Sequence, residues 1–189
     1  MNYLEELLKI RNYTFDSIIE LNRRFLPQRY YSYPWTYPGL DHGRAVLTTE
    51  EQCCAYIAAY GNMHQAKINE VLDKISINTF RSSDIQIIDW GCGQGLATTC
   101  LIDYFKKTGI SPNLIQKVIL IEPSPIALRR AKNHVDAFLK DETKTIIVNK
   151  YLDDVTLPLV VSAKLGFPSA SVALFIVDDT CILPASNHI

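Results

Sequence analysis

The chain has 189 residues, of which 48% are hydrophobic and 21% charged, and its formal net charge is −1. This composition is typical of a globular protein with one sizeable domain, and it provides no overall positive charge for nucleic acid or an anionic membrane. The sequence shows no secretory signal and no uninterrupted apolar segment of membrane-spanning length, so we expect no membrane partner.

The five cysteines and four histidines show none of the spacings typical of zinc sites or of C-x-x-C redox motifs. We therefore expect no metal site. An odd number of cysteines without a disulfide framework favours reduced thiols, and hence a cytoplasmic protein.

The first eighty residues have the apolar spacing of helices, and we expect them to form a helical cap. The first helix falls near residues 4–8, and the second follows Thr14, a residue type favoured at helix N-caps. A capping box at Thr48 and Glu51 predicts a further helix, with Gly61 as its stop.

Between these helices lies a segment rich in prolines and aromatic rings, Arg29-Tyr30-Tyr31-Ser32-Tyr33-Pro34-Trp35-Thr36-Tyr37-Pro38-Gly39. Its prolines exclude a regular helix. Interleaved cations and rings are what single-stranded nucleic acid binds, which makes Arg29, Tyr30, Tyr31 and Trp35 candidate contacts for a nucleic-acid partner. In the alternative, which we expect, the rings pack on the core and the arginines reach solvent.

From residue 84 onward, short apolar runs alternate with amphipathic segments. Strands are predicted at residues 85–89, 118–122, 145–148 and 170–177, with helices at 96–107 and after Ser124-Pro125, and a short helix near 156–166. This alternation indicates βαβ units. We therefore expect an α/β fold in which a Rossmann-like, doubly wound, mainly parallel sheet spans residues 81–189 and the helical cap spans residues 1–80.

The first predicted strand leads into a turn with three glycines in five positions, Gly91-Cys92-Gly93-Gln94-Gly95. Glycine inside a regular element costs roughly 0.5–1 kcal/mol relative to alanine, so three of them indicate a backbone that something approaches closely. A strand, a glycine turn and a helix N-terminus together form a cofactor-binding edge. Dinucleotide sites have the pattern G-x-G-x-x-G, and here the third glycine comes one residue early, which disfavours NAD.

Three segments resemble motifs of the class I S-adenosylmethionine-dependent methyltransferases. Asp89 followed by the G-x-G-x-G pattern is similar to the first motif, an acid before the glycines. The run from Val118 to Glu122 is similar to the second motif, a strand that ends in an acid. The third motif is resembled by Asn149-Lys150-Tyr151-Leu152-Asp153-Asp154-Val155. The resemblance covers residues 84–155.

The resemblance implies S-adenosylmethionine as the cofactor, held by Asp89, Gly91, Cys92, Gly93, Gln94, Gly95, Glu122, Pro123, Asp153 and Asp154. Glu122 would accept hydrogen bonds from both ribose hydroxyls, and Pro123 would lie against the adenine. Asp154, with Asp153 as the second choice, would receive the adenine amino group. The carboxylate of Asp89 suits a ligand that carries an ammonium and a sulfonium.

The function expected from this resemblance is methyl transfer to an unidentified acceptor, which is RNA, protein or a small molecule. Residues 178–184, after the fourth strand, lack the N/D-P-P-Y signature of amino-group methylation on bases, so the catalytic residues stay unknown. Tyr60 or His64 is expected near the methionine end of the cofactor, because both residues lie where two predicted helices meet.

The region after residue 84 is short for a seven-stranded methyltransferase core. A catalytically silent module that binds S-adenosylmethionine is therefore the second hypothesis, and an NAD-dependent oxidoreductase is the third. An open edge on the fourth strand would favour pairing with another chain, so we also expect a possible homodimer.

Overall fold

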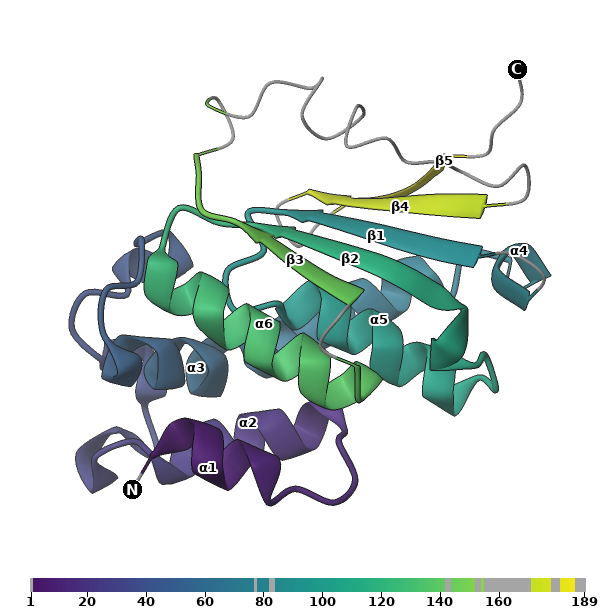
Figure 1. Ribbon diagram of the computed structural model, residues 1–189. Helices are drawn as coiled ribbons and strands as arrows, with labels where there is room; N and C mark the ends of the chain where they lie inside the picture. Colours follow the sequence, from purple (N-terminus) through teal and green to yellow (C-terminus); the bar gives the residue numbers. More distant parts are fainter. Residues whose placement is uncertain are drawn as a thin grey trace.

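The computed structural model describes residues 2–76, 78–81, 84–141, 144–151, 154, 171–177 and 181–185. These residues form an α/β structure in which a sheet lies over layers of helices (Figure 1). The sheet comprises β1 (Asp84–Trp90), β2 (Ile115–Ile121), β3 (Thr145–Val148), β4 (Ser171–Val177) and β5 (Cys181–Ala185). The strand order is β3-β2-β1-β4-β5, with β1 to β4 parallel and β5 antiparallel to β4. The predicted α/β class is confirmed.

The helices are α1 (Tyr3–Leu8), α2 (Phe15–Arg24), α3 (Glu50–Leu72), α4 (Asn78–Arg81), α5 (Leu96–Lys107) and α6 (Pro125–Leu139). Four 3-10 turns are described, η1 (Gln28–Tyr30), η2 (Pro34–Thr36), η3 (Asp41–Gly43) and η4 (Pro112–Leu114). Capping side chains set where several helices begin. Thr14 caps α2 and Ser124 caps α6, as predicted. The capping box of α3 joins Thr49 and Gln52, one residue later than expected.

One continuous helix of 23 residues, α3, replaces the two helices predicted around Gly61. The prediction that Gly61 ends a helix is therefore wrong. A Cβ at this position would lie 3.0 Å from Cγ1 of Ile19, so the missing side chain lets α2 approach α3 closely. This close packing offsets the cost of about 1 kcal/mol for glycine inside a helix.

Figure 1 shows α5 and α6 directly beneath the sheet and α1 and α2 one layer further away. One hydrophobic core joins these layers, because it includes Leu7 and Phe15 from the N-terminal helices together with Ile87 and Leu120 from the strands. The division of the chain near residue 80 stays a prediction. Among the helices that the structure describes, none combines the length and apolar character needed to cross a bilayer.

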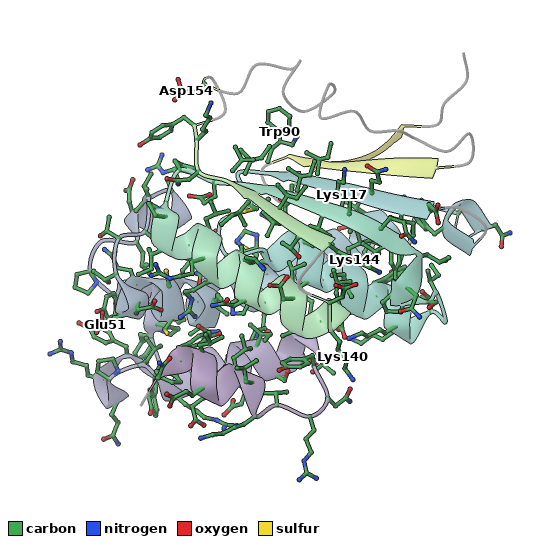
Figure 2. All side chains as sticks on the ribbon, in the orientation of Figure 1. Glu51, Trp90, Lys117, Lys140, Lys144 and Asp154 are labelled. Carbon is green, nitrogen blue, oxygen red and sulfur yellow. The ribbon has the colours of Figure 1, made fainter. Side chains whose placement is uncertain are left out.

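The other face of the sheet carries a smaller apolar cluster of Ile88, Trp90, Ile119 and Ile121. Figure 2 shows Trp90 on this face, turned away from the helices. The fourth strand does not leave the open edge that we expected, because β5 pairs with it along Ala173–Val177. The fourth strand therefore gives no support to the expected homodimer, which stays a prediction. The predicted helix near 156–166 lies outside the described residues.

Candidate functional site

The register of the sheet brings the three predicted motifs to one edge. Trp90 pairs with Ile121, and Ile121 pairs with Val148, so all three strands end at the same level. The residues that follow are Gly91, Glu122 and Asn149, respectively. Because the strands are parallel, these three positions lie side by side at the carboxyl edge, where α/β sheets bind ligands.

The glycine turn between β1 and α5 needs glycine at all three positions. The φ angles of Gly91, Gly93 and Gly95 are +66°, +51° and +74°, in the left-handed region that other residues rarely adopt. The N–H of Cys92 donates to the carbonyl of Ile121 at 3.0 Å, and the N–H of Gly95 donates to the carbonyl of Cys92 at 2.7 Å. These bonds hold the turn against β2.

Gly93 and Gly95 lack side chains for different spatial reasons. A Cβ on Gly95 would lie 3.2 Å from both Cα and Cβ of Ala131, so this glycine lets α6 pack against the turn. A Cβ on Gly93 would meet no atom within 4 Å. Gly93 therefore borders open space, whereas Gly95 is needed for the packing of α6 against the turn.

We expect Gly95→Ala to lower the free energy of unfolding more than Gly93→Ala does. Both changes impose a left-handed φ on alanine, at roughly 1–2 kcal/mol, and only Gly95→Ala adds a clash with the backbone of α6. Urea denaturation of the two variants measures the difference. Equal destabilisation would contradict the packing role of Gly95.

The carboxylate of Glu122 is bound by backbone N–H groups at the end of β2. Oε2 accepts from the N–H of Gly93 at 3.0 Å, and Oε1 accepts from the N–H of Ser124 at 2.8 Å. The side chain is 8% exposed, so one edge of it still reaches the surface. Both carboxylate oxygens therefore help to fix the glycine turn against the start of α6.

A pocket of about 620 Å³ opens at this edge. Among the predicted site residues, its lining includes Gly91, Gly93, Gln94, Glu122 and Pro123. The rest of the wall comes from residues 43–47, from Ala127 and from Tyr56, His64 and Lys67 of α3. The volume lies within the range of about 300–1,000 Å³ that is usual for small-molecule and cofactor sites.

Other predicted residues lie away from this lining. Asp89 is fully buried beneath the turn, where its Oδ2 accepts from the hydroxyl of Thr98 at 2.6 Å and so links β1 to α5. Cys92 and Gly95 support the turn but do not line the pocket. Asp154 is exposed beyond the end of β3 (Figure 2), and Asp153 lies outside the described residues.

His64 is the member of the predicted pair Tyr60 and His64 that reaches the pocket lining. Its Nε2 lies 3.1 Å from the hydroxyl of Tyr56, and the two rings stack at an interplanar angle of 24°. Burial, aided by the Lys67 ammonium, lowers the pKa of His64 to about 4. The imidazole is therefore neutral near pH 7.

Asn149 has a role at this edge that the sequence alone did not indicate. Its Nδ2 donates to the carbonyl of Glu122 at 2.8 Å and to that of Pro123 at 2.9 Å. The position of an asparagine directly after a strand is the signal that could have identified Asn149. At the same edge, the hydroxyl of Ser124 donates to the carbonyl of Leu47 and so links the pocket wall to α6.

Gln94 links the glycine turn to a buried arginine. Its Nε2 donates to the carbonyl of Cys53 in α3 at 2.9 Å, and its Oε1 accepts from Nε of Arg130 at 2.8 Å. Arg130 is 1% exposed and also donates to Glu50 at 2.8 Å. Its guanidinium lies 3.5 Å from the ring centroid of Tyr3, so a cation–π contact adds to these bonds.

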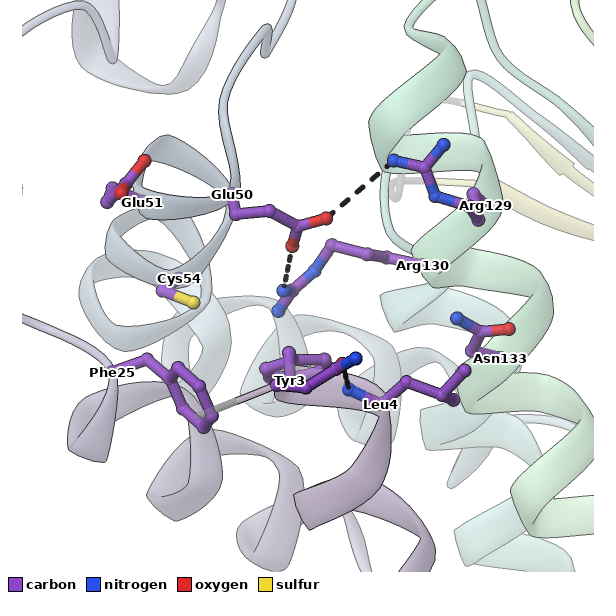
Figure 3. Close-up of a pocket in the computed structure, with 10 residues that line it drawn as sticks. Tyr3, Leu4, Phe25, Glu50, Glu51, Cys54, Arg129, Arg130 and Asn133 are labelled. Carbon is purple, nitrogen blue, oxygen red and sulfur yellow. Dashed lines mark hydrogen bonds and ion pairs between the residues drawn. The ribbon is translucent and has the colours of Figure 1, made fainter.

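Figure 3 shows the pocket of about 410 Å³ beside this arginine. The carboxylate of Glu50 lies between Arg130 and its neighbour Arg129, 3.7 Å from the latter. Arg130 further donates to the side chain of Asn22 in α2. A single buried cation thus joins α2, α3, α6 and the glycine turn.

His134 extends the same network to α1. Its Nε2 lies 2.7 Å from the hydroxyl of Tyr3, and its Nδ1 lies 2.9 Å from the carbonyl of Gln94. Asn22 donates to the hydroxyl of Tyr3 at 2.9 Å. Burial raises the pKa of Tyr3 above its usual value, so this side chain stays a neutral hydroxyl. The network fixes the turn relative to the N-terminal helices.

We expect acidification to weaken the fold through His134. Burial, together with the Arg130 charge, lowers its pKa to about 3 from the ordinary 6.5. Between these values the unfolded chain binds the proton and the folded chain does not, so stability falls as pH drops below about 6.5. From pH 7 to pH 5 His134 contributes roughly 2 kcal/mol to the loss, and His64, whose pKa is also lowered, adds to it.

Urea denaturation at both pH values measures this loss. His134→Gln keeps a donor and an acceptor but does not titrate, so its stability should change less between pH 7 and pH 5. An unchanged pH dependence in this variant would contradict the role given to His134.

Comparisons with known proteins leave the function open. Neither a search against models of protein families nor a search of curated proteins gives a match to this chain. A functional assignment therefore depends on the chemistry of the site. The site combines a turn with three glycines, a carboxylate bound by backbone N–H groups and a pocket lined by two cationic side chains, Arg44 and Lys67.

Proposed function

We propose that this chain binds S-adenosylmethionine at the glycine turn and is a class I methyltransferase with a Rossmann-like, doubly wound fold. The strand order β3-β2-β1-β4 supports the fold, because Rossmann-like sheets have this order and bind ligands beyond the carboxyl ends of their strands. The observation that carries the proposal is the Glu122 carboxylate, which accepts from the N–H of Gly93 in the pocket wall.

The residues of the pocket have the chemistry that each part of this cofactor needs. The Glu122 carboxylate is the kind of acceptor that the two ribose hydroxyls need, and Pro123 offers an apolar surface to the adenine. Gly91 and Gly93 expose backbone without a side chain in the way. Among the described pocket residues, Arg44 and Lys67 supply positive charge for the carboxylate of the methionine part.

A dinucleotide fits this edge less well. NAD places its pyrophosphate on the N-terminus of the helix after the glycines. Here Leu96, Ala97 and Thr98 in the first turn of α5 are all buried. The side chain of Gln94 is 1% exposed and bound to Cys53 and Arg130. These contacts favour a ligand without a diphosphate.

The chain itself has to bind and orient the reactants. S-adenosylmethionine supplies a methyl group that its sulfonium charge has already activated. Correct orientation of reactants contributes about 7–11 kcal/mol to such a reaction. The acceptor, whether RNA, protein or a small molecule, is not identified by the pocket, and a silent module that binds the cofactor without transfer is the second candidate.

Calorimetric titration with S-adenosylmethionine, S-adenosylhomocysteine and NAD tests the cofactor. We expect the first two to bind and NAD to give no heat. Binding of NAD alone would overturn the proposal. Transfer of a tritiated methyl group to pools of RNA, protein or small molecules then distinguishes a methyltransferase from a silent module, which would bind the cofactor and transfer nothing.

A further inference from the structure

Three large aromatic side chains are exposed between α2 and α3. Tyr31, Tyr33 and Trp35 are 53%, 59% and 54% exposed, respectively. This differs from the expected packed segment, in which all rings would contact the core. We call these three residues the aromatic platform. Burying rings of this size is favourable, so three of them in water within five positions point to a partner.

The backbone beneath the aromatic platform is held firmly. Pro34, at the start of η2, is buried, and η2 packs against α3. Tyr30 and Tyr37 contact each other in a tilted arrangement, with centroids 4.8 Å apart, and both pack on the core. The platform rings are therefore presented on a fixed support, which limits the entropy lost when a partner stacks on them.

Arginines lie beside Tyr31, at one end of the aromatic platform. A groove of about 400 Å³ is lined by Arg23 and Arg24 of α2 together with Tyr31 and Glu20. Arg24 pairs with Glu20 at 3.6 Å. Within the described part of the chain, neither Arg23 nor Arg29 has a carboxylate partner, and the Arg29 guanidinium lies 4.8 Å from the ring centroid of Tyr30.

We propose that the aromatic platform and its arginines form a binding surface for single-stranded nucleic acid. Exposed rings with cations beside them suit a strand whose bases alternate with phosphates, since bases stack on the rings and phosphates pair with the cations. A duplex hides its bases and a polyanionic peptide has none, so neither has a group for the rings. This surface is distinct from the pocket at the glycine turn and does not depend on the proposed methyl transfer.

The test is fluorescence anisotropy of a labelled oligo(dT) or oligo(rU) with the full chain, at 50 and 200 mM salt. We expect binding that weakens with salt, with a log–log slope near −2 for three phosphate contacts. Trp35→Ala or Tyr33→Ala should weaken binding roughly 5- to 150-fold. Arg29→Ala should make the salt slope shallower by about 0.7.

Leu8→Ala, at a side chain 65% exposed, and Arg11→Ala are matched controls outside the platform, and both should bind as the parent chain does. Thermal melting verifies that each variant stays folded. Three results would overturn the proposal: no binding at 50 mM salt, equally tight binding of duplex DNA or poly-glutamate, and unchanged affinity in both ring variants.

Discussion

Replacement of Glu122 by alanine is expected to weaken binding of S-adenosylhomocysteine at least about 100-fold. Hydrogen bonds to a charged acceptor contribute about 1.5–3 kcal/mol each, and the proposal gives this carboxylate two ribose hydroxyls. The variant also removes the acceptor for the N–H groups of Gly93 and Ser124, so the turn itself is less well fixed. Isothermal titration calorimetry measures the affinity.

Glu122→Gln is the conservative variant at this position. The amide keeps the size of the side chain and one oxygen, so it can still accept from one backbone N–H, but it carries no charge and its NH2 leaves the other N–H without an acceptor. We expect an affinity and a melting temperature between those of Glu122→Ala and the parent chain. Glu70→Gln, at a carboxylate 72% exposed on α3, is the matched control. Binding by Glu122→Ala within threefold of the parent chain would contradict the proposed site.

Arg130→Ala is expected to lower the free energy of unfolding by roughly 3 kcal/mol, because removal of one member of a buried ionic network leaves its partners without their donor. Gln94 and Asn22 lose this donor in the interior. Glu50 is 49% exposed and can be hydrated, so the effect falls at the lower end of the usual range. Urea denaturation measures the change.

The adjacent Arg129 provides the control. Its side chain is 62% exposed and its contact with Glu50 is 3.7 Å, so Arg129→Ala should change stability by no more than about 0.5 kcal/mol. Comparable destabilisation by the two variants would show that the buried network does not hold the layers together. Both variants replace an arginine of α6 by alanine, and the two arginines differ in burial.

The network supports the proposed function because it fixes the pocket wall. Gln94 lines the pocket on one side and binds Arg130 on the other. The cap is therefore attached to the glycine turn by buried polar contacts as well as by the shared core. Such a network restricts the turn to one position, which is what a preorganised ligand site requires.

The elements fixed by local chemistry could be predicted from the sequence. The glycines of the turn have positive φ, a requirement that appears directly in residue type. Ser124-Pro125 begins α6 and Thr145–Val148 is a strand, as predicted, because caps and apolar runs act over a few residues. Glu122 directly follows β2, as predicted, whereas Asn149 follows β3 and Asp154 lies further along the chain.

The tertiary structure decided the rest, because its contacts join residues far apart in the chain. Arg130 meets Asn22 across 108 positions, and no local pattern marks either residue. Gly61 stays inside a helix because Ile19 of α2 packs there. The sequence by itself determined where the backbone must bend and that an acid follows β2; only long-range packing decided which side chains line the pocket and which rings stay in water.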